Sequence, residues 1–160
     1  MLRRVDQAGT VTTIGAAPGG GWGTLVGVDV DQDPEPYGRA TPGASSYAWN
    51  TWNGGGAPRI GNTGFRIEVR AVPTPPMLTG IVAALAPATA PLSILGMAIA
   101  VDPAARIVDF VGPGATAFTQ AIPLPNAAGL VGTRFFFQSF HVEATSQLAS
   151  SGGLSLTILP

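Results

Sequence analysis

His141 is the only histidine in the chain, and it stands in the aromatic segment RFFFQSFHVEA. Imidazole is the side chain best suited to proton transfer near neutral pH. Hydrolysis would also need an activated nucleophile, but no G-x-S-x-G motif occurs and cysteine is absent. Lysine is absent too, so the glycine-rich loops lack the residue that a phosphate-binding loop places on its ligand. We therefore expect a structural histidine, no catalytic residue, and a protein that is not an enzyme.

Three carboxylates stand close together near the end of the first quarter of the chain. Asp29, Asp31 and Asp33 alternate along VDVDQD, so an extended chain places them on one face. Grouped oxygen donors of this kind can bind Ca²⁺. The order of an EF-hand loop is not met, because Pro34 stands where that loop needs glycine. Two interpretations stay open: a Ca²⁺ site, or a solvated acidic strand end with no cofactor.

Three aromatic residues lie in a segment that is rich in glycine, serine and asparagine. They are Tyr47, Trp49 and Trp52, in SSYAWNTWNGGG. Flat aromatic side chains on a sandwich module can stack on sugar rings, which predicts a carbohydrate-binding site and a glycan partner. The competing interpretation is that they cover an edge of the fold, since tryptophan is usually highly buried.

The elements that must carry these residues are short. The 160 residues include 22 glycines and 15 prolines, which divide a chain into brief segments and favour strands over long helices. Hydrophobic residues make up 46%, enough for a core, whereas charged residues reach only 11%. The net charge of −1 offers no basic surface for phosphates, so we expect no nucleic-acid partner.

An uncharged stretch from Ala71 to Val101 is long enough to cross a bilayer as a helix. Pro87 and Pro91 interrupt it near its centre, and a proline inside a helix costs about 3 kcal/mol. We therefore expect no membrane span. The stretch is predicted to form two buried strands, MLTGIVAALA and LSILGMAIAV, joined by the turn PATAP.

The chain is predicted to have three parts. Residues 1–37 read as a strand-rich extension that begins with a hairpin, residues 38–57 as a Gly/Ser/Asn/aromatic linker, and residues 58–160 as the main domain. In the main domain GFRIEVRAV alternates, with Arg66, Glu68 and Arg70 on a solvated face, and RIVDF and ATAFTQAIPL flank the turn VGPG as a hairpin. The fold class expected is all-β: an antiparallel β-sandwich, jelly-roll or Ig-like, of about seven to nine strands.

One predicted strand indicates a protein partner. One side of the segment from Ser93 to Val101 consists of small and apolar residues that a solvent-facing side should not carry, namely Ile94, Gly96, Ala98 and Ala100. We predict that this side is an assembly face. Residues 1–30 have no core of their own, and a lone hairpin is marginal in water. They should dock on the sandwich or exchange strands with a neighbour.

Four stretches follow one another in a specific order along the chain: GAPRIGNTGFRIEV, APLSILGMAIAVDPA, AIPLPNAAGLVGTRFFFQSFHVE and SGGLSLTIL. Their order resembles that of a C-terminal domain of large secreted proteins of environmental bacteria. The motifs that carry the resemblance are P-x-x-G-N-x-x-F, an apolar strand pair, V-D-P, I-P-x-P, F-Q and S-x-G-L. Residues 1–37 are similar to the last blade of a β-propeller. The resemblance implies a non-catalytic sandwich, secreted or on the cell surface, and carries no catalytic residue.

The function expected is therefore association. A secreted, non-catalytic module of this kind would act in surface attachment or in assembly into filaments or oligomers. Its partner would be another copy of the chain or another surface protein, with carbohydrate binding as the alternative.

Overall fold

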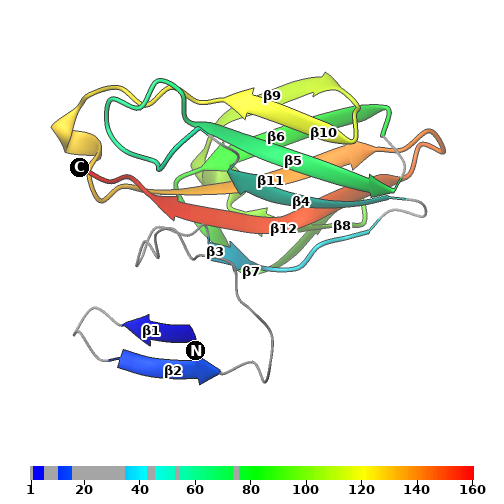
Figure 1. The fold of residues 1–160 in the computed structure, drawn as a ribbon. Coiled ribbons are helices and arrows are strands. Elements are labelled where there is room, and N and C mark those ends of the chain that lie inside the picture. The colour runs from blue at the N-terminus through cyan, green and yellow to red at the C-terminus, as the bar shows by residue number, and fades with distance from the viewer. Residues whose placement is uncertain (1, 6–10, 16–34, 43–45, 53–54, 74–75) are drawn as a thin grey trace. The chain divides into compact units, whose positions relative to one another are not determined.

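The computed structural model describes residues 2–5, 11–15, 35–42, 46–52, 55–73 and 76–160 (Figure 1). The chain divides into two compact units, Met1–Asp33 and Pro34–Pro160. In the first unit, β1 (Leu2–Val5) and β2 (Val11–Gly15) form an antiparallel pair, as the sequence predicts. The acidic segment with Asp29, Asp31 and Asp33 lies outside the described residues.

The second unit contains a two-stranded sheet and two broader antiparallel sheets that form the sandwich (Figure 1). The larger has five strands in the order β3 (Glu35–Tyr37), β12 (Leu148–Thr157), β11 (Arg134–Val142), β6 (Leu78–Ala84) and β9 (Arg106–Pro113). The smaller has three, in the order β10 (Ala117–Ala121), β5 (Arg66–Pro73) and β4 (Ser46–Trp52). Every pairing within these two sheets is antiparallel.

The two sheets enclose one apolar core. Alternate residues of facing strands supply it, as expected where each strand turns one side inward. Its buried members include Phe65, Ile67 and Val69 from the side of β5, and Ile81, Ala83, Phe137, Leu154 and Leu156 from the larger sheet. The predicted all-β, antiparallel sandwich is therefore confirmed.

The helices of the described chain are two short 3₁₀ turns, Pro103–Ala105 and Ala128–Leu130. The first is capped by Asp102, whose Oδ1 accepts a hydrogen bond of 2.9 Å from the backbone N–H of Ala104. Among the residues that the structure describes, no helix has the length and apolar character needed to cross a membrane.

The uncharged stretch forms three strands rather than two. After β6 come β7 (Pro87–Ile94) and β8 (Met97–Val101), which pair with each other. The predicted turn at PATAP was wrong, because these residues belong to β7 and the chain reverses at Leu95–Gly96 instead. Both turn residues have positive φ, 52° and 83°. Prolines are accepted in β7 because it pairs on one side only within the described sheet.

The β7–β8 hairpin packs on the outer side of the larger sheet, away from the main core. Val101 and Ile99 of β8 meet Ala84 and Val82 of β6 and Phe136 of β11 in a second apolar cluster. The hairpin therefore covers part of a face that would otherwise meet water.

Two segments expected outside the sandwich supply strands to it. The short strand β3, from the predicted extension, pairs with β12, and β4, from the predicted linker, pairs along β5. The expected hairpin of β9 with β10 was wrong. These strands follow each other in the chain, but β9 pairs with β6 of the larger sheet and β10 with β5 of the smaller.

Candidate functional site

His141 lies in the middle of the larger sheet. It is on β11, opposite Thr79 of β6 and Ala149 of β12, and only 1% of its surface is exposed. Burial lowers the pKa of His141 below its usual value, and the nearby Glu143 carboxylate offsets part of that effect. The His141 imidazole therefore lies inside the sheet and away from solvent, and the absence of a catalytic role stays a prediction.

The three aromatic candidates lie on a strand instead of in a linker. Tyr47, Trp49 and Trp52 belong to β4, the outer strand of the smaller sheet, opposite Val72, Arg70 and Ile67 of β5 respectively. The structure thus brings all three onto one strand. Carbohydrate binding by these residues stays a prediction.

The proposed calcium ligands Asp29, Asp31 and Asp33 fall outside the described residues, so that site stays a prediction as well. Within the part of the chain that the structure describes, no group of three or more His, Cys, Asp or Glu side chains is placed to hold a metal ion.

The predicted assembly face is not one continuous uncovered surface. Ile94 ends β7, Gly96 lies in the turn, and Ala98 and Ala100 belong to β8. The N–H of Ala98 donates to Thr41 Oγ1 at 2.8 Å, and Ala100 is buried against the sandwich. The outer half of the hairpin is the part that reaches solvent.

Gln138 fastens the hairpin to the larger sheet. Its Oε1 accepts from the N–H of Ala100 at 2.8 Å, while its Nε2 donates to the carbonyl oxygens of Ala98 and Ser151 at 2.8 and 2.9 Å. The hydroxyl of Ser150 donates to the same Ala98 carbonyl at 2.9 Å. Side chains thus satisfy backbone groups that another strand would normally satisfy. The sequence feature that indicates this role is a single glutamine among the phenylalanines of RFFFQSF.

Asn62 and Asp102, two polar residues of the stretches quoted above, also make local hydrogen bonds. Asn62 Nδ2 donates to the carbonyl oxygens of Gly55 and Ala57, both at 2.8 Å, and its Oδ1 accepts from the N–H of Gly64 at 2.9 Å. One amide therefore closes the loop that leads into β5. Together with the cap at Asp102 and the bridge at Gln138, it gives three polar residues of the quoted stretches a structural contact.

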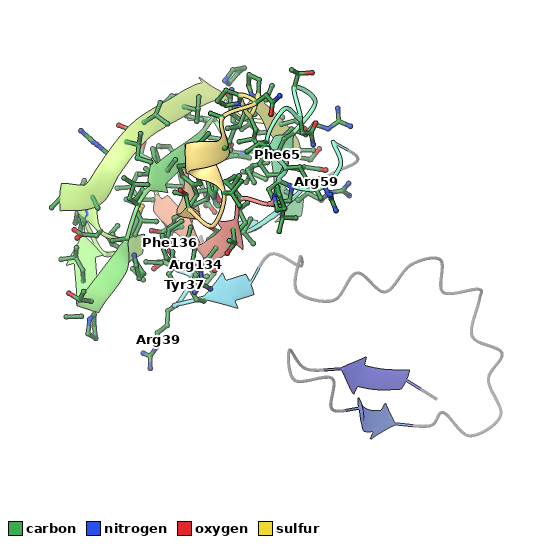
Figure 2. The ribbon with its side chains drawn as sticks, turned by 90° about the vertical axis from the view of Figure 1, so that its left-hand side faces the viewer. Tyr37, Arg39, Arg59, Phe65, Arg134 and Phe136 are labelled. Atoms are coloured by element: carbon green, nitrogen blue, oxygen red, sulfur yellow. The ribbon has the colours of Figure 1, made fainter. Side chains whose placement is uncertain are left out.

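An aromatic and cationic cluster holds β3 against the larger sheet. The edge of the Tyr37 ring meets the Phe136 ring with centroids 5.7 Å apart, and the Arg134 guanidinium lies 5.6 Å from the centre of the Phe136 ring. Arg134 Nη2 also donates to Ser155 Oγ at 2.9 Å. Figure 2 shows Tyr37, Arg134 and Phe136 together, with Arg39 extending away from them. Burial raises the pKa of Tyr37 to about 12, partly offset by the positive charge of Arg134.

A groove of about 410 Å³ runs between this cluster and the β7–β8 hairpin. Its walls are Tyr37, Gly38 and Arg39 on one side and residues 88–92 and 98–100 of the hairpin on the other. Most of these side chains are small or apolar, and Arg39 contributes a charge. The groove has the volume of a small-ligand site but few converging polar groups.

Exposed apolar side chains gather at two other places. Leu92, Ile94 and Leu95 form the tip of the β7–β8 hairpin, hereafter the hairpin tip, and Leu95 is 80% exposed. On β9, the outer strand of the larger sheet, Ile107 is 50% and Val111 57% exposed.

A pocket of about 190 Å³ lies beside β9, and we call it the β9 pocket. Its lining residues are all apolar and come from strands of the larger sheet and from segments outside the strands; they include Ile107, Val108, Phe110, Ile122, Leu124 and Phe135. Apolar surfaces of this kind can bind an apolar side chain or another protein. Alternation of residue types could not reveal them, because it does not tell which strand is outermost.

Comparison with known proteins adds no relative: neither a family model, nor a curated protein, nor a solved structure matches this chain.

Proposed function

We propose that this chain is a non-catalytic module that works by association with copies of itself or with another surface protein. The observation that carries the proposal is the exposure of large apolar side chains on the outer strand β9 and at the hairpin tip. Monomeric proteins rarely expose contiguous apolar patches larger than a few hundred Å², and patches above that size mark contacts with a partner. Fully burying one such side chain contributes about 1.5–3 kcal/mol, so a few of them can drive association.

Secretion and display at a surface, with assembly into filaments or oligomers, belong to the same proposal. Their support is the ordered sequence pattern together with the structural work of Asn62, Asp102 and Gln138 within it. Exchange of the N-terminal strands is also part of it. The β1–β2 pair is short, and an isolated pair of strands is marginal in water unless it meets another sheet.

Sedimentation of the full chain from micromolar to millimolar concentration tests this function. We expect the average mass to rise with concentration and the rise to persist in molar salt, because screening weakens ion pairs but not apolar contacts. Val111→Lys should weaken association by placing a charge on exposed β9. Met77→Lys is the matched control, since Met77 is 63% exposed but lies on neither β9 nor the hairpin. A strictly monomeric chain at millimolar concentration would contradict self-association.

A further inference from the structure

We propose that the hairpin tip of one copy inserts Leu95 into the β9 pocket of a second copy, so that copies join head to tail. This inference rests on the proposed function and names the two surfaces that meet. Both surfaces belong to the second unit, Pro34–Pro160, and the occupant of the pocket is a defined side chain of the same protein.

The conformation of Leu95 is the first argument. Its φ of 52° lies in the left-handed region, which a bulky residue rarely adopts, and Gly96 follows with φ of 83°. A two-residue hairpin turn with both φ values positive favours Asn-Gly. Leucine here strains the backbone and leaves its side chain 80% exposed, so it contributes little to the fold of its own copy. Strain of this kind at an exposed position points to a role in binding.

The size and lining of the β9 pocket are the second argument. An apolar cavity of about 150 Å³ can hold a benzene molecule, so a pocket of about 190 Å³ has room for one branched aliphatic side chain. The pocket reaches the surface at Ile107 and Val108, which are both exposed. Its deeper walls include the buried residues Phe137 and Leu156 of the main core.

The charges of the two surfaces are compatible. The hairpin tip lies in the uncharged stretch from Ala71 to Val101. At the β9 pocket, Arg106 and Asp109 flank Ile107 and Val108 in sequence and form an ion pair of 3.1 Å. Contact between the two surfaces would therefore not strip water from an unpaired charge, which would be costly.

The symmetry of the contact follows from the fact that the hairpin tip and the β9 pocket are two different surfaces of each copy. The tip and the pocket are different surfaces formed by different strands, so the contact is heterologous and each added copy offers a new free tip or pocket. A hairpin tip is also much smaller than the roughly 800 Å² per partner of a typical stable interface. We therefore expect weak, concentration-dependent growth into open chains of copies rather than a tight closed dimer.

Two variants of the full chain separate the halves of the contact. Leu95→Asn removes the apolar side chain but suits the positive φ, so the fold should be kept or slightly stabilised. Ile107→Glu places a charge at the mouth of the β9 pocket. Each variant should weaken self-association at least tenfold in sedimentation experiments. Met77→Asn, which changes an exposed apolar residue elsewhere, should leave it unchanged.

Mixing the two variants provides the decisive measurement. Leu95→Asn retains an intact pocket and Ile107→Glu an intact tip, so an equimolar mixture should form two-chain complexes that grow no further. Absence of these complexes, or undiminished association of Leu95→Asn while the wild type associates, would overturn the inference and leave the proposed function standing. If the wild type stays monomeric, the inference is overturned together with the self-association part of the proposed function. If the wild type binds phosphatidylcholine vesicles and Leu95→Asn does not, the hairpin tip binds lipid and the inference is overturned.

Discussion

The buried side chain of His141 links the stability of the sandwich to pH. Its pKa is lowered in the folded chain and returns to about 6.5 on unfolding, so the unfolded chain binds a proton more readily. The stabilising contribution is therefore fully present above pH 6.5 and is lost as the pH falls from 6.5 towards the lowered pKa. We expect the free energy of unfolding to fall by up to about 1.4 kcal/mol per pH unit from this group.

Urea unfolding at a series of pH values from 7 to 5 measures this effect. The comparison is His141→Gln, which cannot titrate in this range; its unfolding free energy should vary less steeply with pH than that of the wild type, even if it is lower throughout. Equal slopes for the two proteins would show that His141 does not carry the dependence.

Individual residues were predictable where local pattern decides their environment. His141 is buried inside a sheet, whereas the structural, non-catalytic role expected for it stays a prediction. The solvated face expected for Arg66, Glu68 and Arg70 was wrong at Glu68, which is 2% exposed and pairs with Arg70 at 2.6 Å. Alternation along a strand tells which residues share a face, but not whether that face is covered.

The β7–β8 hairpin depends on a side chain from another element. Gln138→Leu removes the acceptor for the N–H of Ala100 and a donor to the carbonyl oxygen of Ser151. A buried polar group left without a partner costs about 1–3 kcal/mol, so we expect the free energy of unfolding to fall by about 2 kcal/mol. Hydrogen exchange of the Ala100 amide should accelerate more than exchange in β12.

A glutamine with an exposed hydrogen bond supplies the control for this experiment. Gln120 of β10 donates only to the neighbouring Ala121 carbonyl among the contacts described, so Gln120→Leu should change the unfolding free energy by a few tenths of a kcal/mol. Similar losses for the two variants would argue against the bridging role of Gln138.

Most strands were predictable, and the failures have physical causes. Segments of β5, β6, β11 and β12 show the expected alternation or apolar run. The turn at Leu95–Gly96 was missed because proline usually marks turns. Here Pro87 and Pro91 lie in a strand that pairs along only one edge with the strands that the structure describes. The strand β4 was missed because glycine, serine and asparagine surround its aromatic residues and suggest a linker.

The molecule as a whole divides at residue 34, and its main unit contains its own core. Every described member of the two apolar clusters lies between Tyr37 and Ile158. We therefore expect a chain of residues 34–160 to unfold cooperatively, with a melting temperature within a few degrees of that of the full chain. Differential scanning calorimetry measures this directly.

A shorter chain that begins at residue 43 tests the boundary itself. It lacks Tyr37, which packs on Phe136, and Thr41, which accepts from the N–H of Ala98. Its melting temperature should be clearly lower than that of residues 34–160. If the two chains melt alike, β3 and its cluster contribute nothing to the sandwich.

The arrangement of strands in space was the least predictable level. Local signals indicate that β9 and β10 adjoin a turn, but their partners β6 and β5 are decided by how the two sheets pack. The exposure of Ile107 and Val111, on which the candidate surface depends, follows from the outer position of β9 in its sheet. No pattern within RIVDFVGP reveals that position.

The prolines of β7 have a further consequence for the most hydrophobic part of the chain. Pro87 and Pro91 carry no N–H, so the row of donors along this strand is broken at two positions. A broken row is a poor template for a further extended chain, and stacked cross-β fibrils require an unbroken one. The prolines of β7 thus protect this strand of the uncharged stretch against amyloid growth.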